Sequence, residues 1–333
     1  MKILVIRFSS IGDIVLCSPI LRALKEKYPE AEIQFLTKRK FLPLVEFNPN
    51  LSGSILLDDS LRKVVRQVRH HHFDLIIDLH NNLRSRWIGL LSGKPVLTYQ
   101  KENWAKWLLI KTGKNRLSGK HVVERYFDSV RPLGIVPAPF GLEFYACDCE
   151  EPEESQLPEF TRTGKYAVLS IGGTHATKKM PAEKWMELCL FLSCPIILAG
   201  GPEDESLAIE IINGSAKKTD RIFNACGKFS IGGTAHLLKN AALVISHDTG
   251  LMHIASAYRV PVVCIWGNTV PDFGFQPYKT RHFNLEVKDL DCRPCSRTGL
   301  DVCPKAHFKC MKEQNMQSPE LWKFINQVLA EQE

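Results

Sequence analysis

A strand, a polar turn and a helix follow one another at the start of the chain, where residues 3–14 read ILVIRFSSIGDI. The run Ile3–Arg7 predicts a buried strand. Apolar residues recur at helical spacing along Ile14–Lys27, and Pro29 ends that pattern. A strand that leads through a short turn into a helix is the repeating unit of parallel α/β proteins. The first residues therefore predict an α/β fold.

The same order continues along the chain and restarts once. In the first half we expect a strand, a helix and a further strand at Glu32–Thr37, Leu61–His71 and Leu75–Leu79. Residues 149–155 read CEEPEES, an acidic, proline-bearing linker. Beyond it we expect the strands Tyr166–Ile171, Pro195–Ala199, Leu243–Ser246 and Val262–Ile265 and the helix Ala182–Leu192. Two such halves predict a ligand in the cleft between them.

The length of 333 residues exceeds the roughly 250–300 at which a single core stops growing. We therefore expect two domains, over residues 1–155 and 156–318. Residues 319–333 hold a last helix, Pro319–Ala330, which we expect to pack back on the first domain.

Charge is divided unevenly between the halves. Residues 1–150 hold 23 Lys and Arg against 15 Asp and Glu, a net +8, whereas residues 151–333 hold 20 against 21, a net −1. This asymmetry predicts that the first half meets an acidic ligand. A well-solvated surface is the alternative interpretation.

The turn after the first strand holds a single glycine, so it lacks the G-x-G-x-x-G pattern of dinucleotide-binding dehydrogenases. It carries the hydroxyls of Ser9 and Ser10 and the carboxylate of Asp13 at a helix start. Asp13 has two interpretations: it caps the helix, or it acts as a general base that takes a proton from an attacking hydroxyl.

Three loops of the second half carry groups suited to a nucleotide. Residues 171–181 read IGGTHATKKMP, in which glycines allow close backbone approach, Thr174 offers a hydroxyl and Lys178 offers a charge suited to phosphate oxygens. Residues 199–205, AGGPEDE, bring carboxylates that could bind ribose hydroxyls.

The third loop, residues 246–253, reads SHDTGLMH and opens an apolar helix-like stretch. A helix start with free N–H groups is an anion site. Asp248 would cap this helix or hold a ribose or a cation, and His253 would face the ligand or serve a structural role.

These stretches together resemble glycosyltransferase family 9, the ADP-heptose:lipopolysaccharide heptosyltransferases. The resemblance covers nearly the whole chain and is carried, in order, by Ser9–Ile14, Asp78–His80, Arg84-Ser85, Lys178–Pro181, Gly200–Pro202 and Asp248–His253. Each motif is weak alone, but their order and spacing together are specific. The resemblance implies a GT-B fold, in which two Rossmann-like α/β/α domains face each other across a central cleft.

The resemblance also implies roles for residues at matching positions. Asp13 would be the general base, and Lys178 would assist catalysis at the leaving diphosphate. The donor would be bound by Thr174, Lys178, Glu205, Asp248, Thr249, Gly250 and His253. On the acceptor side we add the hydroxyls of Ser9 and Ser10 and, from the charge of the first half, Arg84 and Arg86; a solvated surface is the alternative for the two arginines.

The implied reaction is inverting transfer of heptose from ADP-heptose, or of another sugar from its nucleotide, to an anionic lipid A-core acceptor at the membrane surface. It implies no cofactor and no catalytic metal. Alternatives are another family 9 transferase, a nucleotide-sugar 2-epimerase, or a non-catalytic nucleotide-sugar-binding protein.

Four cysteines near the end of the chain form a separate cluster. Cys292 and Cys295 make a C-x₂-C pair, but Cys303 and Cys310 have six residues between them (C-x₆-C), outside the usual zinc-ligand spacing. The cluster is consistent with a structural zinc site or with reduced or disulfide-capable thiols.

Composition excludes other classes. No run approaches 18 apolar residues, and the apolar start is too short for a signal peptide, so we expect a cytoplasmic protein without a transmembrane segment. The lipid A-core acceptor that the resemblance implies would place the protein peripherally at the inner face of the cytoplasmic membrane. Basic residues are dispersed and no nucleic-acid-binding motif appears, so we expect no nucleic-acid partner.

Overall fold

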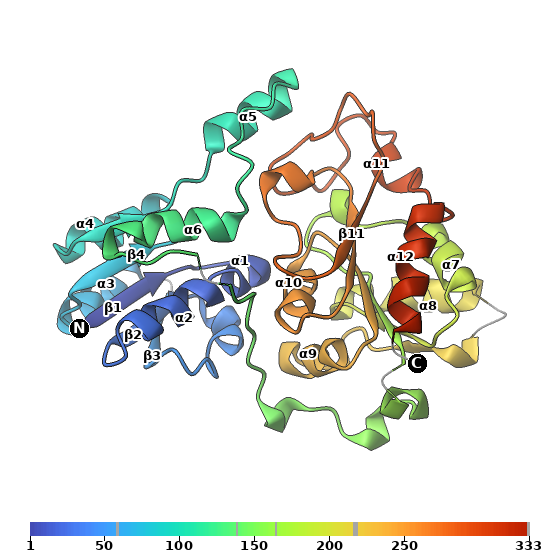
Figure 1. Ribbon diagram of the computed structural model, residues 1–333, viewed down its shortest axis with the longest axis horizontal. Helices are drawn as coiled ribbons and strands as arrows, with labels where there is room; N and C mark the ends of the chain where they lie inside the picture. The colour runs from blue at the N-terminus through green and yellow to red at the C-terminus, as the bar shows by residue number, and fades with distance from the viewer. Residues whose placement is uncertain (58–59, 138, 164, 216–218, 332–333) are drawn as a thin grey trace. The chain divides into compact units, whose positions relative to one another are not determined.

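The computed structural model describes residues 1–57, 60–137, 139–163, 165–215 and 219–331, and the chain divides into two compact units. Unit 1 comprises Met1–Glu102 and Lys120–Cys147, and unit 2 comprises Asn103–Gly119 and Asp148–Glu333 (Figure 1). Each unit contains a wholly parallel sheet flanked by helices, so the predicted α/β class is confirmed.

The sheet of unit 1 has the strand order β3-β2-β1-β4-β5, in which the chain reverses direction across the sheet beside β1. Its strands are β1 (Lys2–Ile6), β2 (Glu32–Thr37), β3 (Gly53–Leu56), β4 (Leu75–Asp78) and β5 (Val96–Thr98). Its helices are α1 (Ile11–Val15), α2 (Ser18–Lys27), α3 (Leu61–His70), α4 (Leu83–Ser92) and α6 (Val122–Val130). Apolar residues of β1, β4, α3 and α4 form one buried cluster, so α3 and α4 share a face of this sheet.

One predicted helix of unit 1 is divided. The pattern over Ile14–Lys27 predicts a single helix, but the structure forms α1 and then α2, which begins at Ser18. Pro19 lies in the first turn of α2, where its missing N–H group costs no hydrogen bond. A short separate helix, α1, therefore carries Asp13.

Unit 2 contains the order β11-β10-β9-β6-β7-β8. Its strands are β6 (Ala167–Ser170), β7 (Ile196–Ala199), β8 (Ile222–Asn224), β9 (Leu243–His247), β10 (Val262–Trp266) and β11 (His282–Glu286). Its helices are α5 (Asn103–Thr112), α7 (Ala182–Phe191), α8 (Glu205–Gly214), α9 (Ile231–Lys239), α10 (Gly250–Ala257), α11 (Lys309–Lys312) and α12 (Pro319–Ala330).

Two expectations about domain membership are wrong. The last helix belongs to unit 2, where Leu321, Ile325 and Val328 of α12 are buried in the core and α12 contacts β9 and β11 (Figure 1). The predicted boundary at residue 155 also differs, because unit 2 begins at Asp148 and includes α5. There Lys106 Nζ lies 5.0 Å from the ring centroid of Phe275, a cation–π contact that ties α5 to unit 2.

Within the described residues, no helix combines the length and the apolar character that crossing a membrane requires.

Candidate active site

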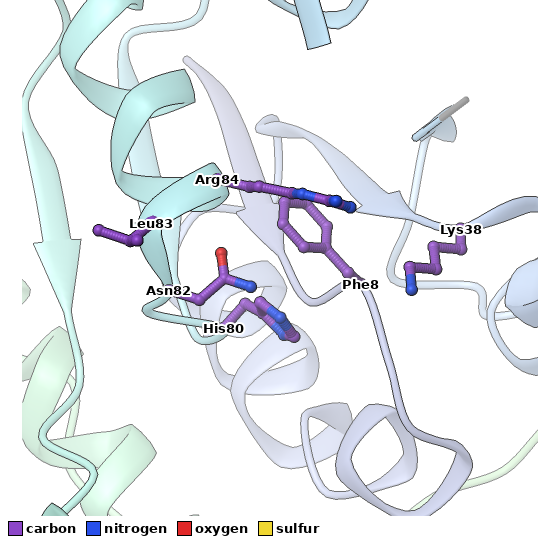
Figure 2. Close-up of a pocket in the computed structure, with 6 residues that line it drawn as sticks. All are labelled: Phe8, Lys38, His80, Asn82, Leu83 and Arg84. Atoms are coloured by element: carbon purple, nitrogen blue, oxygen red, sulfur yellow. The ribbon is translucent and has the colours of Figure 1, made fainter. Parts of the chain in front are cut away.

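A pocket of about 330 Å³ lies in unit 1 where three neighbouring parallel strands end. It is lined by Phe8, Lys38, His80, Asn82, Leu83 and Arg84, whose side chains are drawn in Figure 2. Phe8 follows β1, Lys38 follows β2, and the other four follow β4. Carboxyl ends of parallel strands meet at one edge of a sheet, which is where α/β proteins bind ligands.

Asp78 holds the loop that forms one side of this pocket. Its buried carboxylate accepts the N–H groups of His80 (2.9 Å) and Asn81 (2.7 Å) and the hydroxyl of Ser85 (2.7 Å). Asn82 then caps α4, since its side chain accepts the N–H of Ser85 at 2.9 Å. The loop is thus fixed by hydrogen bonds before any ligand binds, and we interpret Asp78 as a structural residue.

The pocket is cationic. Lys38 and Arg84 line it, and no carboxylate is among its described lining residues. The ring of His80 lies 4.6 Å from that of Phe8, and burial, with the nearby charge of Arg7, lowers the pKa of His80 to about 3. His80 is therefore neutral at physiological pH. Two side-chain cations without a carboxylate favour an anionic ligand.

Asp13 forms a tight ion pair beside this pocket. Its Oδ1 lies 2.6 Å from Nη2 of Arg7, and its Oδ2 accepts the hydroxyl (2.8 Å) and the N–H (3.2 Å) of Ser10. Arg7 in turn donates from Nε to the carbonyl of Ser9 (2.8 Å) and from Nη1 to the carbonyl of Leu79 (2.5 Å). The bond to the Ser10 N–H fulfils the predicted capping role, and the ion pair with Arg7 is additional to it.

The charge state of Asp13 follows from these contacts. Burial by itself raises the pKa of Asp13, but the charge of Arg7 and the hydrogen bonds from Ser10 outweigh burial and lower it overall. The carboxylate is therefore ionised at neutral pH. Its side chain keeps 20% exposure, which leaves a face open to a ligand hydroxyl.

The predicted acceptor residues are not all brought together. Arg84 lines the pocket, whereas Nε of Arg86 donates to the side chain of Asn81 at 2.8 Å and Arg86 is not among the lining residues. The hydroxyl of Ser10 is directed to Asp13, and the carbonyl of Ser9 accepts from Arg7. The sequence assigned no role to Lys38 or to His80, which lies in the motif Asp78–His80; the position of each directly after a strand, β2 or β4, could have indicated it.

In unit 2 the three predicted loops meet. A Cβ atom placed on Gly172 would lie 3.2 Å from Cα of Gly200, and one placed on Gly173 would lie 3.6 Å from Cγ2 of Thr249. The buried Asp204 joins them, since it accepts Nζ of Lys179 at 2.6 Å and the N–H of Gly201 at 3.0 Å. Glycine is therefore favoured at Gly172, because a Cβ atom there would collide with the carboxylate of Asp204, which these hydrogen bonds hold in place.

Lys178 and Asp248 form a further, largely buried ion pair in unit 2. Nζ of Lys178 lies 2.6 Å from Oδ2 of Asp248 and also donates to the Asp248 carbonyl at 2.9 Å. The hydroxyl of Thr269, after β10, donates to the same Oδ2 at 3.0 Å. The side chains of Lys178 and Asp248 are 15% and 12% exposed, so the pair is largely shielded from solvent.

Behind this pair, His247 joins two loops. Its Nε2 accepts the N–H of Met180 at 3.0 Å, and Nδ1 lies 3.4 Å from the carbonyl of Gly172. Burial lowers the pKa of His247 to about 4, so the ring is neutral, with its proton on Nδ1 in this arrangement. His247 thereby sets the position of the Lys178 loop, a role the sequence did not indicate.

The remaining predicted donor residues occupy different positions. Thr249 is the N-cap residue of α10, Gly250 is its first residue, and His253 is buried within it. Thr174 is exposed on the glycine-rich loop, and Glu205 is exposed at the start of α8. Asp248 does not cap α10; it pairs with Lys178 instead.

The segment that contains Cys292, Cys295 and Cys303 is hydrogen-bonded to the loop after β10 and to the loop of Lys178. Arg293 donates to the carbonyls of Gly267 (2.6 Å) and Thr269 (2.9 Å) and pairs with Glu286 at 2.7 Å. The N–H of Leu300 donates to Oγ1 of Thr177 at 2.8 Å. The segment therefore supports the loop that carries Lys178.

The described residues of this segment do not form a metal-binding site. Cys292, Cys295, Cys303 and Cys310 are free thiols, and within the described ranges no group of three or more His, Cys, Asp or Glu side chains is arranged to hold a metal ion. The structural zinc hypothesis thus receives no support from this part of the chain.

Solved structures similar to this chain include glycosyltransferases. The glycosyl transferase family 9 protein from Veillonella parvula is 22% identical with a TM-score of 0.74, covering 99% of this chain and 97% of its own. The Escherichia coli heptosyltransferase WaaC with ADP is 19% identical with a TM-score of 0.68, covering 98% of this chain and 100% of its own. The chain has the GT-B fold of this class of transferases.

The family model described as glycosyltransferase family 9 (heptosyltransferase) matches residues 61–305. The chain therefore belongs to glycosyltransferase family 9, and it is an enzyme of the transferase class. Among curated relatives, lipopolysaccharide heptosyltransferase 1 of Pseudomonas aeruginosa is 24% identical over 98% of this chain and 95% of its own length.

Proposed function

We propose that this protein transfers heptose from ADP-heptose to an inner-core Kdo or heptose of a lipopolysaccharide precursor, at the inner face of the cytoplasmic membrane. The observation that carries this proposal is the cationic pocket beside the ionised Asp13 in a family 9 chain. The relatives it matches along nearly their whole length are named lipopolysaccharide and lipooligosaccharide heptosyltransferases, which supports heptose as the sugar.

On the acceptor side, Lys38 and Arg84 would bind carboxylates or phosphates of the core, and Asp13 would act on the nucleophile. The acceptor hydroxyl loses its proton to Asp13 as its oxygen attacks the anomeric carbon. The bond from that carbon to the ADP oxygen breaks on the opposite face, so the configuration inverts. Because its pKa is lowered, Asp13 is a weak base. It takes the proton late in the transfer step, when the forming bond between the acceptor oxygen and the anomeric carbon has made the hydroxyl acidic.

On the donor side, Lys178 would stabilise charge on the departing diphosphate. Its bonds to Asp248 use two of the three N–H donors of an ammonium group, and we assign the third to a phosphate oxygen. The start of α10 at Thr249 and Gly250 supplies further N–H groups. Thr174 would add a hydroxyl to the diphosphate, and Asp248, His253 and Glu205 would line the nucleoside part.

The test of the function is whether donor consumption requires an acceptor. With ADP-heptose and a truncated core acceptor that exposes Kdo or heptose, we expect ADP release and a product heavier by one heptose. Without acceptor we expect neither. Consumption of the nucleotide-sugar in the absence of acceptor would indicate a 2-epimerase, and donor binding without any turnover would indicate a non-catalytic binding protein.

The acceptor pocket makes a separate prediction. Lys38→Ala and Arg84→Ala should each raise the KM for a water-soluble core acceptor roughly 10- to 100-fold, since a hydrogen bond to a charged group contributes about 1.5–3 kcal/mol. The KM for the donor should not change. Arg86→Ala is the matched control, because Arg86 bonds to Asn81 and does not line the pocket. Equal effects of Arg84→Ala and Arg86→Ala on the acceptor KM would contradict the assignment.

A further inference from the structure

An apolar stripe on α4 is exposed. Leu83, Trp87, Leu90 and Leu91 are 76%, 52%, 71% and 38% exposed. Residues at these spacings share one side of a helix. The opposite side is turned to the sheet, where Ile88 is fully buried and a Cβ on Gly89 would lie 3.0 Å from Val96. The stripe is therefore a surface feature of α4 and takes no part in the core of unit 1.

Basic residues flank this stripe on α4 and are also exposed on the neighbouring helix α3. Arg84 and Arg86 are exposed, and at 100° per residue they lie on either side of it. The neighbouring helix α3 contacts α4 and exposes Arg62, Lys63, Arg66 and Arg69. Neither helix contains Asp or Glu. We call the exposed residues of these two helices the α3–α4 surface; it combines apolar groups with cations and includes no side-chain anion.

We propose that the α3–α4 surface docks on an anionic lipid bilayer. Leucine and tryptophan side chains enter the boundary between headgroups and acyl chains, while flanking arginines remain at the level of the phosphates. Cations on α3 add attraction to anionic headgroups. A nucleic acid would use the cations but would leave the leucines exposed to water, so the combination favours a lipid surface.

The inference rests on the proposed function in one respect. Leu83 and Arg84 belong both to the α3–α4 surface and to the lining of the pocket. Docking through α4 would therefore bring the pocket to the bilayer surface, where the sugar of a lipid-anchored acceptor is exposed. The hydrocarbon of that acceptor would stay in the membrane during transfer.

Vesicle binding tests this proposal without donor or acceptor. The full-length protein is sedimented with phosphatidylcholine vesicles that contain phosphatidylglycerol, and with vesicles of phosphatidylcholine alone. We expect Arg62→Gln/Lys63→Gln/Arg66→Gln to weaken binding to the anionic vesicles about 100-fold, since each cation near the surface contributes about fivefold. Trp87→Gln/Leu90→Gln should weaken it by about tenfold or more.

The matched control removes three exposed lysines of unit 2, in Lys165→Gln/Lys239→Gln/Lys323→Gln, and should bind like the wild type. ADP affinity, measured in solution, should be unchanged in all variants and reports on folding. The proposal is overturned if the α3 variant and the α4 variant both bind the vesicles as strongly as the wild type, or if the control loses as much binding as they do. Either result would favour a protein as the partner of this surface. Intact vesicle binding without any heptose transfer would instead contradict the proposed function.

Discussion

Asp13→Asn is expected to lower kcat roughly 10²–10⁴-fold, the contribution of a general base, while ADP affinity is unchanged. The amide is the same size, its oxygen can still accept the hydrogen bond of Arg7, and its NH2 group can donate to the hydroxyl of Ser10, so only the bond from the Ser10 N–H is lost. It cannot take a proton from the acceptor hydroxyl. Steady-state kinetics with saturating donor and acceptor, alongside calorimetric ADP titration, provide the measurement.

Arg7→Gln distinguishes a catalytic Asp13 from a merely structural one. The charge of Arg7 lowers the pKa of Asp13. Its removal should therefore raise that pKa and move the acidic limb of the kcat/KM profile to higher pH, because turnover requires the ionised carboxylate. Activity should recover on the alkaline side. Should Arg7→Gln instead lose as much activity as Asp13→Asn at every pH, the pair would be structural and Asp13 would act only as a cap.

Lys178→Met is expected to lower kcat about 10²–10³-fold and to raise the donor KM. A preorganised charge directed at a departing group typically contributes this much, and it also binds the diphosphate of the ground state. The substitution leaves Asp248 without its ammonium partner in a position only 12% exposed, so some stability is lost as well. Transfer rates and ADP affinity measured below the unfolding temperature separate the two effects.

Lys179→Met is the matched control for this second prediction. Lys179 is adjacent in sequence and forms an ion pair of the same length, 2.6 Å, with the buried Asp204. Its loss should destabilise the protein comparably but reduce kcat much less, because we assign no phosphate contact to it. Equal losses of kcat in the two variants would show that Lys178 acts by holding its loop.

Local patterns along the chain predicted much of the fold. Apolar runs of four to six residues between helical stretches specified the strands β1, β2, β4, β6, β7, β9 and β10 to within a residue or two at each end. The short or amphipathic strands β3, β5, β8 and β11 were not predicted, because three to five half-exposed residues carry little periodic signal. Glycine-rich turns indicated the loops of unit 2 correctly.

Helix α4 shows where periodicity fails. Four apolar residues at helical spacing would ordinarily be assigned to the core. In the structure they are exposed, and Ser85, Ile88 and Gly89 face the sheet instead. Which side of a helix is buried depends on the strand that packs against it, and here Val96 of β5 lies against Gly89. Tertiary packing decides which strand that is, so the periodicity of the helix alone does not predict its buried side.

The sequence by itself thus determined the α/β class, the presence of two halves, the loops and the family resemblance, because these depend on contacts between residues close in the chain or on motifs in order. The tertiary structure decided which groups meet: Lys178 with Asp248 across 70 residues, Arg7 with the Leu79 carbonyl across 72, and Lys38 with Arg84 in one pocket. Parallel strands bring distant carboxyl ends to one edge, and strand order is a long-range property that local spacing does not encode.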